Sequence, residues 1–416
     1  MFNSKIYQHI KNKMLKKWRL YHATDFQSLM YPCFTVCRIL GVFPYKFNTS
    51  TFEYSKPYYI MSTVVICVNC ILGFFVMHGI IISKLNFGNV RNFEIIGYCT
   101  ICCFIMIITH ILSGPRMCLL QTIMEISSRL SSKSYQKLSI LIHTKDIIGL
   151  IFLIMQMCIY FVKNRMFKFE NYMLIVAIVV IVYMTLLQFQ MHMLYINCVC
   201  ILKACFQSIN NNLAHMQRLI ISDTKLCDPG LFYKIQRNQF SLNRLKTLKK
   251  QHLVISNTVQ KLNIIFSLQI LATIVMSFCT ITFEVYCFAI HWNDGIFINF
   301  DAHFLVALST SISYYVIKIS LLVWACETGK NKAQEISTTV HDLLNSTNNE
   351  QIKNELQLFS LQILHRRNIF SAKGLTVDTK LLAVIIGNIT TYLVILVQFL
   401  HISHSCDEKA AINHIT

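Results

Sequence analysis

One long apolar stretch near the carboxyl end of the chain contains amide and hydroxyl side chains. Polar groups at bilayer depth are costly and usually face protein or water. At helical spacing, Phe399, Ile395 and Tyr392 fall on one face of this stretch, beside Gln398 and Thr391. These five side chains could line a pore, in which Phe399 forms an apolar constriction and the amide of Gln398 hydrates a passing cation. Alternatively, the polar groups could hydrogen-bond between packed helices.

Two charged residues, Glu284 and Lys318, lie in other apolar stretches. Their depths differ by roughly 10 Å at 1.5 Å per residue, so we expect no ion pair between them, and Lys318 can extend toward the inner membrane surface. The carboxylate of Glu284 could accept the hydroxyl groups of a sugar, pair with a cationic compound, or be a hydrogen-bonded structural group. Aromatic and polar side chains in the same half of the predicted spans could complete a small-molecule pocket, although tyrosine is also common at membrane interfaces. The candidate ligand-binding residues are Tyr98, Gln156, Tyr160, Glu284, Tyr286 and His303.

No combination of side chains in the sequence suits catalysis or metal binding. A nucleophile, a base and an orienting acid do not occur together, and no glycine-rich phosphate loop is present. The pairs Cys67/Cys70 and Cys99/Cys102 have CxxC spacing, but each lies in an apolar stretch without a second pair of ligands. We therefore predict that the protein is not an enzyme and needs neither a cofactor nor a metal.

The composition indicates which elements position these residues. The chain has 416 residues, of which 54% are apolar and 14% charged, and its mean hydropathy is +0.50. Such a mix is typical of a membrane protein. We predict an all-α polytopic fold with seven transmembrane helices, because seven stretches approach the length that crosses a bilayer. These spans are residues 58–82, 94–113, 147–162, 172–194, 262–290, 302–325 and 379–400.

The basic residues predict how these spans are oriented. The first twenty residues are basic and lack the apolar core of a cleavable signal peptide, so we expect the amino terminus in the cytosol. With that orientation, 31 of the 38 Lys and Arg residues fall on the cytosolic side, six outside and one, Lys318, within a span. This bias agrees with the positive-inside rule and places the carboxyl terminus outside. It also accounts for the net charge of +19 without a nucleic acid partner.

Two long segments on the cytosolic side show helical periodicity. After the fourth span, apolar residues recur at steps of three or four up to Ile220, so the helix should continue beyond the bilayer. Between the sixth and seventh spans, Ile352, Leu356, Phe359 and Ile363 form a narrow apolar seam. These helices could lie on the anionic inner leaflet or bundle together below the membrane. The narrow seam favours a bundle, which would be a natural site of oligomerisation.

The last span carries the most specific pattern in the sequence. Thr391-Tyr392, five apolar residues and Gln398-Phe399 resemble the signature that insect gustatory receptors carry in their last span. Residues 370–382 and 31–44 are similar to the segments that this family places before its last and its first span. Together with the seven spans, the resemblance covers nearly the whole chain.

That resemblance implies a ligand-gated, nonselective cation channel, assembled as a homotetramer or as a mixed tetramer with related subunits. It implies that the last span of each subunit lines the pore, that cytosolic helices anchor four subunits, and that a small-molecule tastant binds in the outer half of the other spans. The permeating ions would be Na⁺, K⁺ and also Ca²⁺, attracted by acids near the pore mouth such as Asp407 and Glu408. The resemblance also implies that the subunit lies in the plasma membrane of sensory neurons, in contact with lipid.

Three other classes of protein compete with this interpretation. An olfactory-type receptor would need a coreceptor, and the intact signature argues against it. A G-protein-coupled receptor would have its amino terminus outside. A secondary transporter would show internal repeats and broken spans.

The expected organisation divides the chain into seven parts. They are a cytosolic amino-terminal segment (1–57), transmembrane helices one to four (58–194), a cytosolic helical extension (195–261), transmembrane helices five and six (262–326), cytosolic anchor helices (327–378), a pore-lining seventh helix (379–400) and an extracellular tail (401–416).

Overall fold

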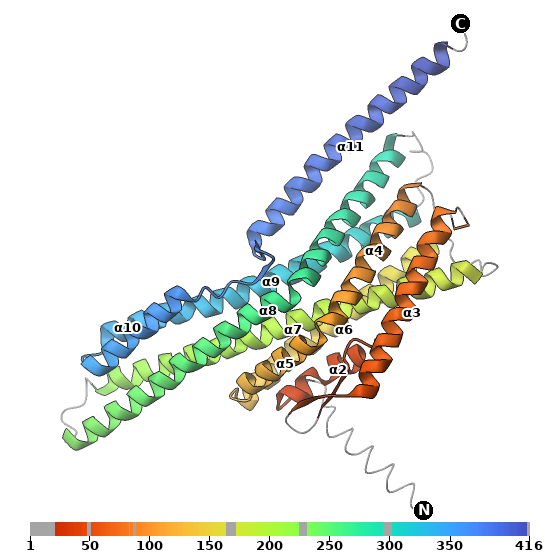
Figure 1. Ribbon diagram of the computed structural model, residues 1–416. Coiled ribbons are helices and arrows are strands. Elements are labelled where there is room, and N and C mark those ends of the chain that lie inside the picture. The colour runs from red at the N-terminus through yellow and green to blue at the C-terminus, as the bar shows by residue number, and fades with distance from the viewer. Residues whose placement is uncertain are drawn as a thin grey trace, which may run out of the picture.

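The computed structural model describes residues 21–47, 51–82, 84–85, 89–163, 172–223, 231–293 and 302–413. Within these residues, seven helices are long and apolar enough to cross a membrane, which confirms the predicted all-α fold with seven spans. Figure 1 shows most of them running side by side, with α11 projecting from one end. The seven are α3 (Lys56–Ile81), α4 (Asn89–Ile111), α6 (Ser132–Lys163), α7 (Tyr172–Asp223), α8 (Leu231–Asn293), α9 (Ala302–Ser346) and α11 (Thr379–Asn413).

Three helices, α7, α8 and α9, continue without a break from the membrane-crossing part into a second bundle. For α7, the apolar residues that recur up to Ile220 predicted such a continuation. With 63 residues, α8 is about 95 Å long at 1.5 Å per residue, roughly three times the thickness of a bilayer core. In the second bundle, α10 (Glu350–His365) packs on α8 and α9, and its seam residues Ile352, Leu356 and Phe359 are buried. We call this end of the molecule, formed by α10 and the adjoining parts of α7, α8 and α9, the extension end, and the opposite end of the bundle the far end.

A short helix and a hairpin pack near the amino-terminal end of α3. Phe34 stacks on Phe43 with ring centroids 4.6 Å apart, and both are buried. Burial raises the pKa of the Tyr45 hydroxyl, which therefore stays protonated and donates a hydrogen bond to the carbonyl of Ser113. This contact joins the hairpin to the start of α5 (Ser113–Ser127). The helix is α2 (Phe26–Ile39), and the antiparallel strands are β1 (Tyr45–Phe47) and β2 (Phe52–Tyr54).

A second hairpin connects the extension end to α11, where the sequence analysis predicted no strands. It consists of β3 (Ser371–Ala372) and β4 (Leu375–Thr376), paired antiparallel. The two residues between them, Lys373 and Gly374, have φ angles of +50° and +86°. Two-residue loops of this kind need positive φ at both positions, which explains the glycine in the segment that resembles the gustatory receptors.

Asn263 of α8 holds this second hairpin against the bundle. Its Nδ2 donates to the carbonyl of Ile369 at 2.7 Å, and its Oδ1 accepts from the backbone N–H of Ser371 at 3.2 Å. On the other side, the buried ring of Phe370 lies against Gly329 of α9. The hairpin is therefore clamped between α8 and α9 immediately before α11 begins.

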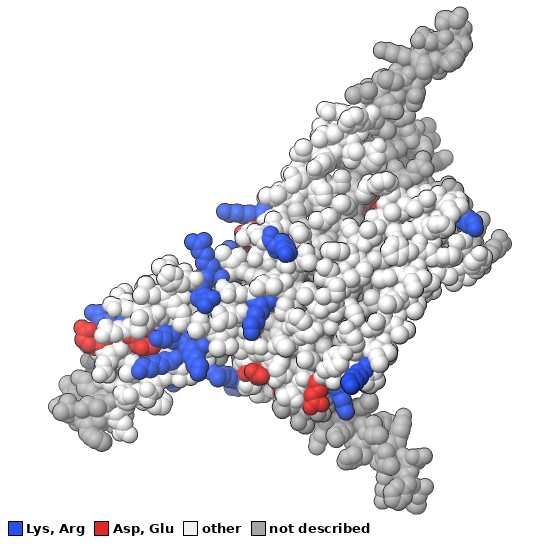
Figure 2. Space-filling model, in the orientation of Figure 1, with Lys and Arg blue, Asp and Glu red and all other residues white. Residues whose placement is uncertain are grey.

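Two helices extend beyond the spans predicted for them. The exposed apolar surface of α6 begins at Ile140 rather than at residue 147, and α11 continues past residue 400 to Asn413. Charge follows the same division of the molecule. On the face shown in Figure 2, Lys and Arg gather toward the extension end, whereas the membrane-crossing part is nearly free of charge. This distribution is expected for a bundle whose sides face lipid.

Candidate ligand-binding cavity and pore helix

A small cavity lies among α4, α6, α7 and α9 toward the far end of the bundle. Its volume is about 70 Å³. Ligand pockets for drug-sized molecules usually have roughly 300–1,000 Å³, so a ligand here must be small or must widen the site. The lining residues are Glu94, Ile95, Tyr98, Gln156, Met157, Phe161, Ile181, Thr185 and Tyr315.

The cavity combines an apolar wall with a few polar groups. The hydroxyls of Tyr98 and Thr185 lie 2.5 Å apart, and Thr185 donates to the carbonyl of Ile181 at 2.7 Å, so Tyr98 donates to Thr185. The amide of Gln156 forms no hydrogen bond with the residues that the structure describes. It is therefore available to a ligand. Such a site suits a small amphipathic organic molecule.

The structure brings two of the six predicted ligand-binding residues, Tyr98 and Gln156, to this cavity. Tyr286 is half-buried on α8 and is not among the lining residues. The side chains of Tyr160 and His303 lie outside the described part of the structure. Thr185 and Tyr315 were not predicted, because they carry no signal in the sequence apart from their depth in the spans.

Glu284 does not line the cavity but belongs to an ion-pair cluster next to it. Arg91 Nη1 is 2.6 Å from Glu94 Oε2 and 3.1 Å from Glu284 Oε1, and all three side chains are largely buried. Glu94 belongs to the cavity lining, so the cluster links the cavity to α8. The predicted absence of a pair between Glu284 and Lys318 agrees with this arrangement. Arg91 was not predicted as the partner, although it lies near the amino-terminal end of α4 and Glu284 near the carboxyl-terminal end of α8, both toward the far end of the bundle.

Lys318 does not extend toward the extension end. Its ammonium lies 5.9 Å from the ring centroid of Tyr314 and 5.8 Å from that of Tyr315, in a site where the residue is 4% exposed. Long helical side chains point back toward the amino-terminal end of their helix, which brings Lys318 to the residues three and four positions earlier. Among the described residues its Nζ has no hydrogen-bond acceptor, so cation–π contacts are its main stabilisation.

The five predicted pore residues lie on α11, the least covered of the seven spans. Only 11% of the α11 span is buried, against 28–61% for the other six. Phe399 is 68% exposed and Tyr392 is 53% exposed, and Ile395, Gln398 and Thr391 are also exposed. The side chains of Asp407 and Glu408 lie outside the described part of the structure.

Among the described residues, α11 makes most of its contacts with two helices. It packs on α8 and α9, and the ring of Tyr392 meets Phe278 of α8 edge-on at 5.9 Å. The hydroxyl of Thr391 donates to the carbonyl of Gly387 at 2.9 Å, within the same helix. The exposed apolar sides of such a long helix must be covered by lipid or by other protein chains.

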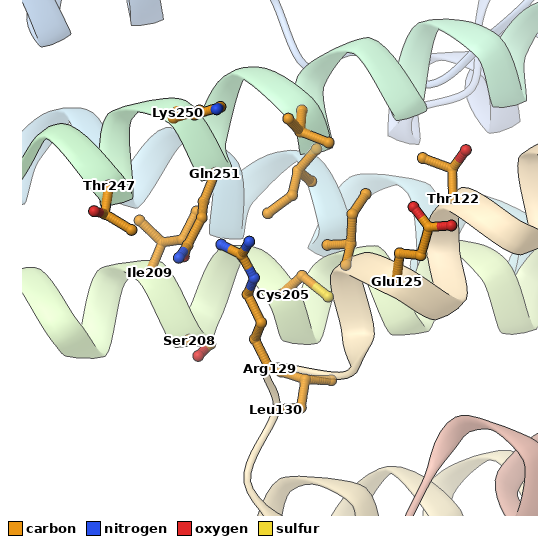
Figure 3. Close-up of a pocket in the computed structure, with 13 residues that line it drawn as sticks. Thr122, Glu125, Arg129, Leu130, Cys205, Ser208, Ile209, Thr247, Lys250 and Gln251 are labelled. Carbon is orange, nitrogen blue, oxygen red and sulfur yellow. The ribbon is translucent and has the colours of Figure 1, made fainter. Parts of the chain in front are cut away.

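Larger cavities occur nearer the extension end. One of about 410 Å³ lies between α5, α7 and α8, where the side chain of Arg129 points into the space beside Gln251 (Figure 3). Two others have about 600 and 610 Å³. None of the predicted ligand-binding or pore residues lines these three cavities.

Comparison with known proteins identifies relatives of this chain. The chain matches the family model described as 7tm Chemosensory receptor over residues 30–400. It is similar to Putative gustatory receptor 28b and Putative gustatory receptor 28a of Drosophila melanogaster, at 31% identity over 154 residues and 28% over 170 residues. These matches cover 36% and 40% of this chain and 32% and 38% of the relatives, so they span about a third of the relatives' length.

The fold is similar to that of the insect olfactory receptor OR5 from Machilis hrabei. The TM-score is 0.68 at 12% identity, with 89% of this chain and 97% of that chain covered. The structure of OR5 in complex with eugenol gives a TM-score of 0.64 at 13% identity. At such low identity the likeness shows the fold alone. The family match over most of the chain and the similarity to two gustatory receptors confirm the resemblance found in the sequence, and the chain belongs to the 7tm chemosensory receptor family.

Proposed function

We propose that this chain is a subunit of a gustatory-type, ligand-gated, nonselective cation channel. The observation that carries the proposal is α11, an apolar helix of 35 residues of which only 11% of the span is buried. Four copies of α11 around an axis would cover one another and surround a pore. Phe399 and Ile395 would then form apolar rings, and Gln398, Thr391 and Tyr392 would supply polar groups to ions.

Exposed apolar residues at the extension end support the same proposal. On α10, Leu358, Leu361 and Leu364 are 53–73% exposed, on a helix that otherwise packs in the bundle below the membrane. Exposed apolar residues on a helix outside the bilayer favour contact with another subunit. We propose a homotetramer, or a mixed tetramer with related subunits.

The cavity among α4, α6, α7 and α9 is the proposed tastant site, with Tyr98 and Gln156 as contacts. With the amino terminus in the cytosol, as the basic residues of the sequence predict, this cavity would lie in the outer half of the membrane. OR5, which has the same fold, has been solved in complex with eugenol, and this supports binding of a small organic molecule. A ligand would open the channel only if it binds the open state more tightly than the closed state.

Two routes connect the proposed site to the pore helix. On α9, Tyr315 lines the cavity, and the same helix packs on α11. On α8, Glu284 pairs with Arg91, and Phe278 meets Tyr392 of α11. A shift of either helix on ligand binding would therefore reach α11.

The ions conducted would be Na⁺, K⁺ and Ca²⁺, and the subunit would act in the plasma membrane of sensory neurons.

Whole-cell current tests the proposal directly. The chain is expressed alone in a heterologous cell and exposed to a panel of sugars and bitter compounds, with G-protein signalling blocked. We expect a ligand-evoked, weakly selective cation current. A receptor that remains at the cell surface but is silent, both alone and with related subunits, would contradict the proposal.

Two variants separate the proposed site from the proposed gate. We expect Gln156→Leu to raise the half-maximal ligand concentration about 2- to 12-fold, the loss corresponding to one hydrogen bond, without basal current. We expect Phe399→Ala to give basal current without ligand, because it removes the apolar constriction. Phe74→Ala on α3, where Phe74 is 62% exposed, is the matched control and should leave both quantities unchanged.

A further inference from the structure

A basic groove lies beside the linker between α5 and α6. Its volume is about 600 Å³, and it is formed by this linker, the first turns of α6 and one side of α7. We call it the linker groove and define it by six of its lining residues: Arg129, Ser131, Ser134, Lys137, Lys203 and Gln207. None of the described residues that line it is acidic.

The polar groups of the linker groove suit a phosphate-bearing ligand. Arg129, Lys137 and Lys203 supply three positive charges, and Lys203 is held in place by a cation–π contact, with its Nζ 5.0 Å from the ring centroid of Trp324. Ser131 and Ser134 add hydroxyls, which lie 2.9 Å apart at the start of α6. Cations and hydroxyls at a helix amino terminus are the groups that phosphate oxygens prefer.

Two of the cations have no competing internal partner. In the described part of the chain, neither Arg129 nor Lys137 forms an ion pair with an acidic side chain. Arg129 also borders the adjacent cavity of about 410 Å³, into which Figure 3 shows its guanidinium pointing. A change of side-chain rotamer would turn this unpaired guanidinium from that cavity into the linker groove, which Arg129 also lines.

The surface of α6 places the linker groove at the edge of the membrane. The exposed residues of its first turns are polar and include Lys133 and Lys137. From Ile140 onward the exposed residues are apolar; Ile140 and Ile148, for example, are 54% and 61% exposed. The change from polar to apolar marks the boundary between headgroups and acyl chains. Leu141 belongs both to the groove lining and to this apolar surface, so the two are continuous.

We propose that the linker groove binds a polyphosphorylated inositol headgroup, with the lipid's acyl chains lying along the apolar surface of α6. The shared chemistry is a small ring that carries several phosphate groups, and a free inositol phosphate would present the same groups. The apolar surface above the groove favours the lipid. This proposal rests on the proposed function in one respect: the extension end must lie in the cytosol, on the side of the membrane where this lipid is found.

Binding to the purified full chain in phosphatidylcholine nanodiscs tests the proposal. The probe is a fluorescent, short-chain phosphatidylinositol 4,5-bisphosphate. We expect saturable binding, weakened at least tenfold in the double variant Arg129→Gln/Lys137→Gln, because each cation near an anionic headgroup contributes substantially to affinity. The matched control is Lys261→Gln/Lys353→Gln, which removes the same charge from exposed positions on α8 and α10 outside the groove and should change affinity less than about twofold.

Three results would overturn the proposal. The double variant could bind as the unaltered chain does, the control could lose as much affinity as the double variant, or binding could be absent altogether. Elution of both variants as the same oligomer as the unaltered chain shows that they are folded. The single variant Lys137→Gln gives a second reading, with an expected loss of at least threefold.

Competition by soluble inositol 1,4,5-trisphosphate distinguishes the two sources of phosphate. We expect it to bind more weakly than the lipid, because it makes no contact with the apolar surface of α6. Equal affinity would support the phosphate site and overturn the lipid as its source. Both faces of a nanodisc are accessible and no current is needed, so binding without ligand-evoked current would contradict the proposed channel function alone.

Discussion

The ion pair between Arg91 and Glu284 joins two membrane-crossing helices at a depth where charge is costly. Glu284 is 3% exposed, and Arg91 also contacts Glu94, which lines the candidate cavity. Removing one partner of a buried pair leaves the other charge without compensation and typically costs about 3–5 kcal/mol. The pair therefore bears on both stability and the shape of the cavity wall.

We expect Arg91→Gln to lower the melting temperature of the purified protein in detergent, in line with a loss of about 3–5 kcal/mol. The double variant Arg91→Gln/Glu284→Gln should recover part of the loss, because one of the two carboxylates that faced Arg91 is then neutral. Glu327→Gln is the control, since its pair with Lys330 is 3.4 Å long and partly exposed, and a change below about 1 kcal/mol is expected. An unchanged melting temperature for Arg91→Gln would show that the pair contributes little.

Depth along a helix explains what could be predicted for single residues. Periodicity and hydropathy identified Tyr98 and Gln156 as candidates for one half of the bundle, and both line the cavity. Depth alone does not reveal which face of a helix meets which neighbour. For that reason depth predicted that Lys318 would not pair with Glu284 but gave no indication of Arg91 as the partner.

At the scale of elements, the hairpin before α11 depends on one glycine of α9. A Cβ atom at Gly329 would lie 2.9 Å from Cε2 of Phe370, closer than real contacts allow, and 3.4 Å from Cγ1 of Val199. Phe370 is buried and is the residue next to β3. Close packing of α9 against the hairpin therefore requires the absence of a side chain at position 329.

We expect Gly329→Ala to destabilise the protein by about 1–3 kcal/mol, as is usual when a packed site is overfilled. Gly114→Ala in α5 is the same change in another helix, with no atom within 4 Å of the new Cβ, and should be neutral or stabilise by up to about 1 kcal/mol. Thermal unfolding of the two variants measures both effects. A Gly329→Ala variant as stable as Gly114→Ala would show that Phe370 moves aside freely.

Long helices were more predictable than the short strands between them. The predicted seam repeats at helical spacing: Ile352, Leu356 and Phe359 are buried, and Ile363 is half-buried. The two strands of the second hairpin have only two residues each, too few for an alternating pattern to appear. Their position is set by tertiary contacts, such as the two hydrogen bonds of Asn263, which no local pattern reveals.

For the whole molecule, the distribution of charge predicts how it is inserted. Lys and Arg gather toward the extension end, and the positive-inside rule places that end in the cytosol. We expect an epitope tag on the amino terminus to be stained only after cells are permeabilised, and a tag on the carboxyl terminus to be stained on intact cells. The reverse pattern would indicate the orientation of a G-protein-coupled receptor and would contradict the channel proposal.

The unbroken course of α8 limits how the length of this chain can change during evolution. One end of α8 meets α10 through Gln362, whose Nε2 donates to the carbonyl of Lys249 at 3.0 Å, and the other end meets α4 through Glu284. Each residue of an α-helix adds a rotation of about 100° and a rise of about 1.5 Å. Inserting or deleting one residue between Lys249 and Glu284 would turn one set of contacts away from its partners. A change by two whole turns would restore the rotation but shift one set of contacts by about 10 Å along the axis. Homologues that keep both sets of contacts should therefore keep the number of residues between Lys249 and Glu284.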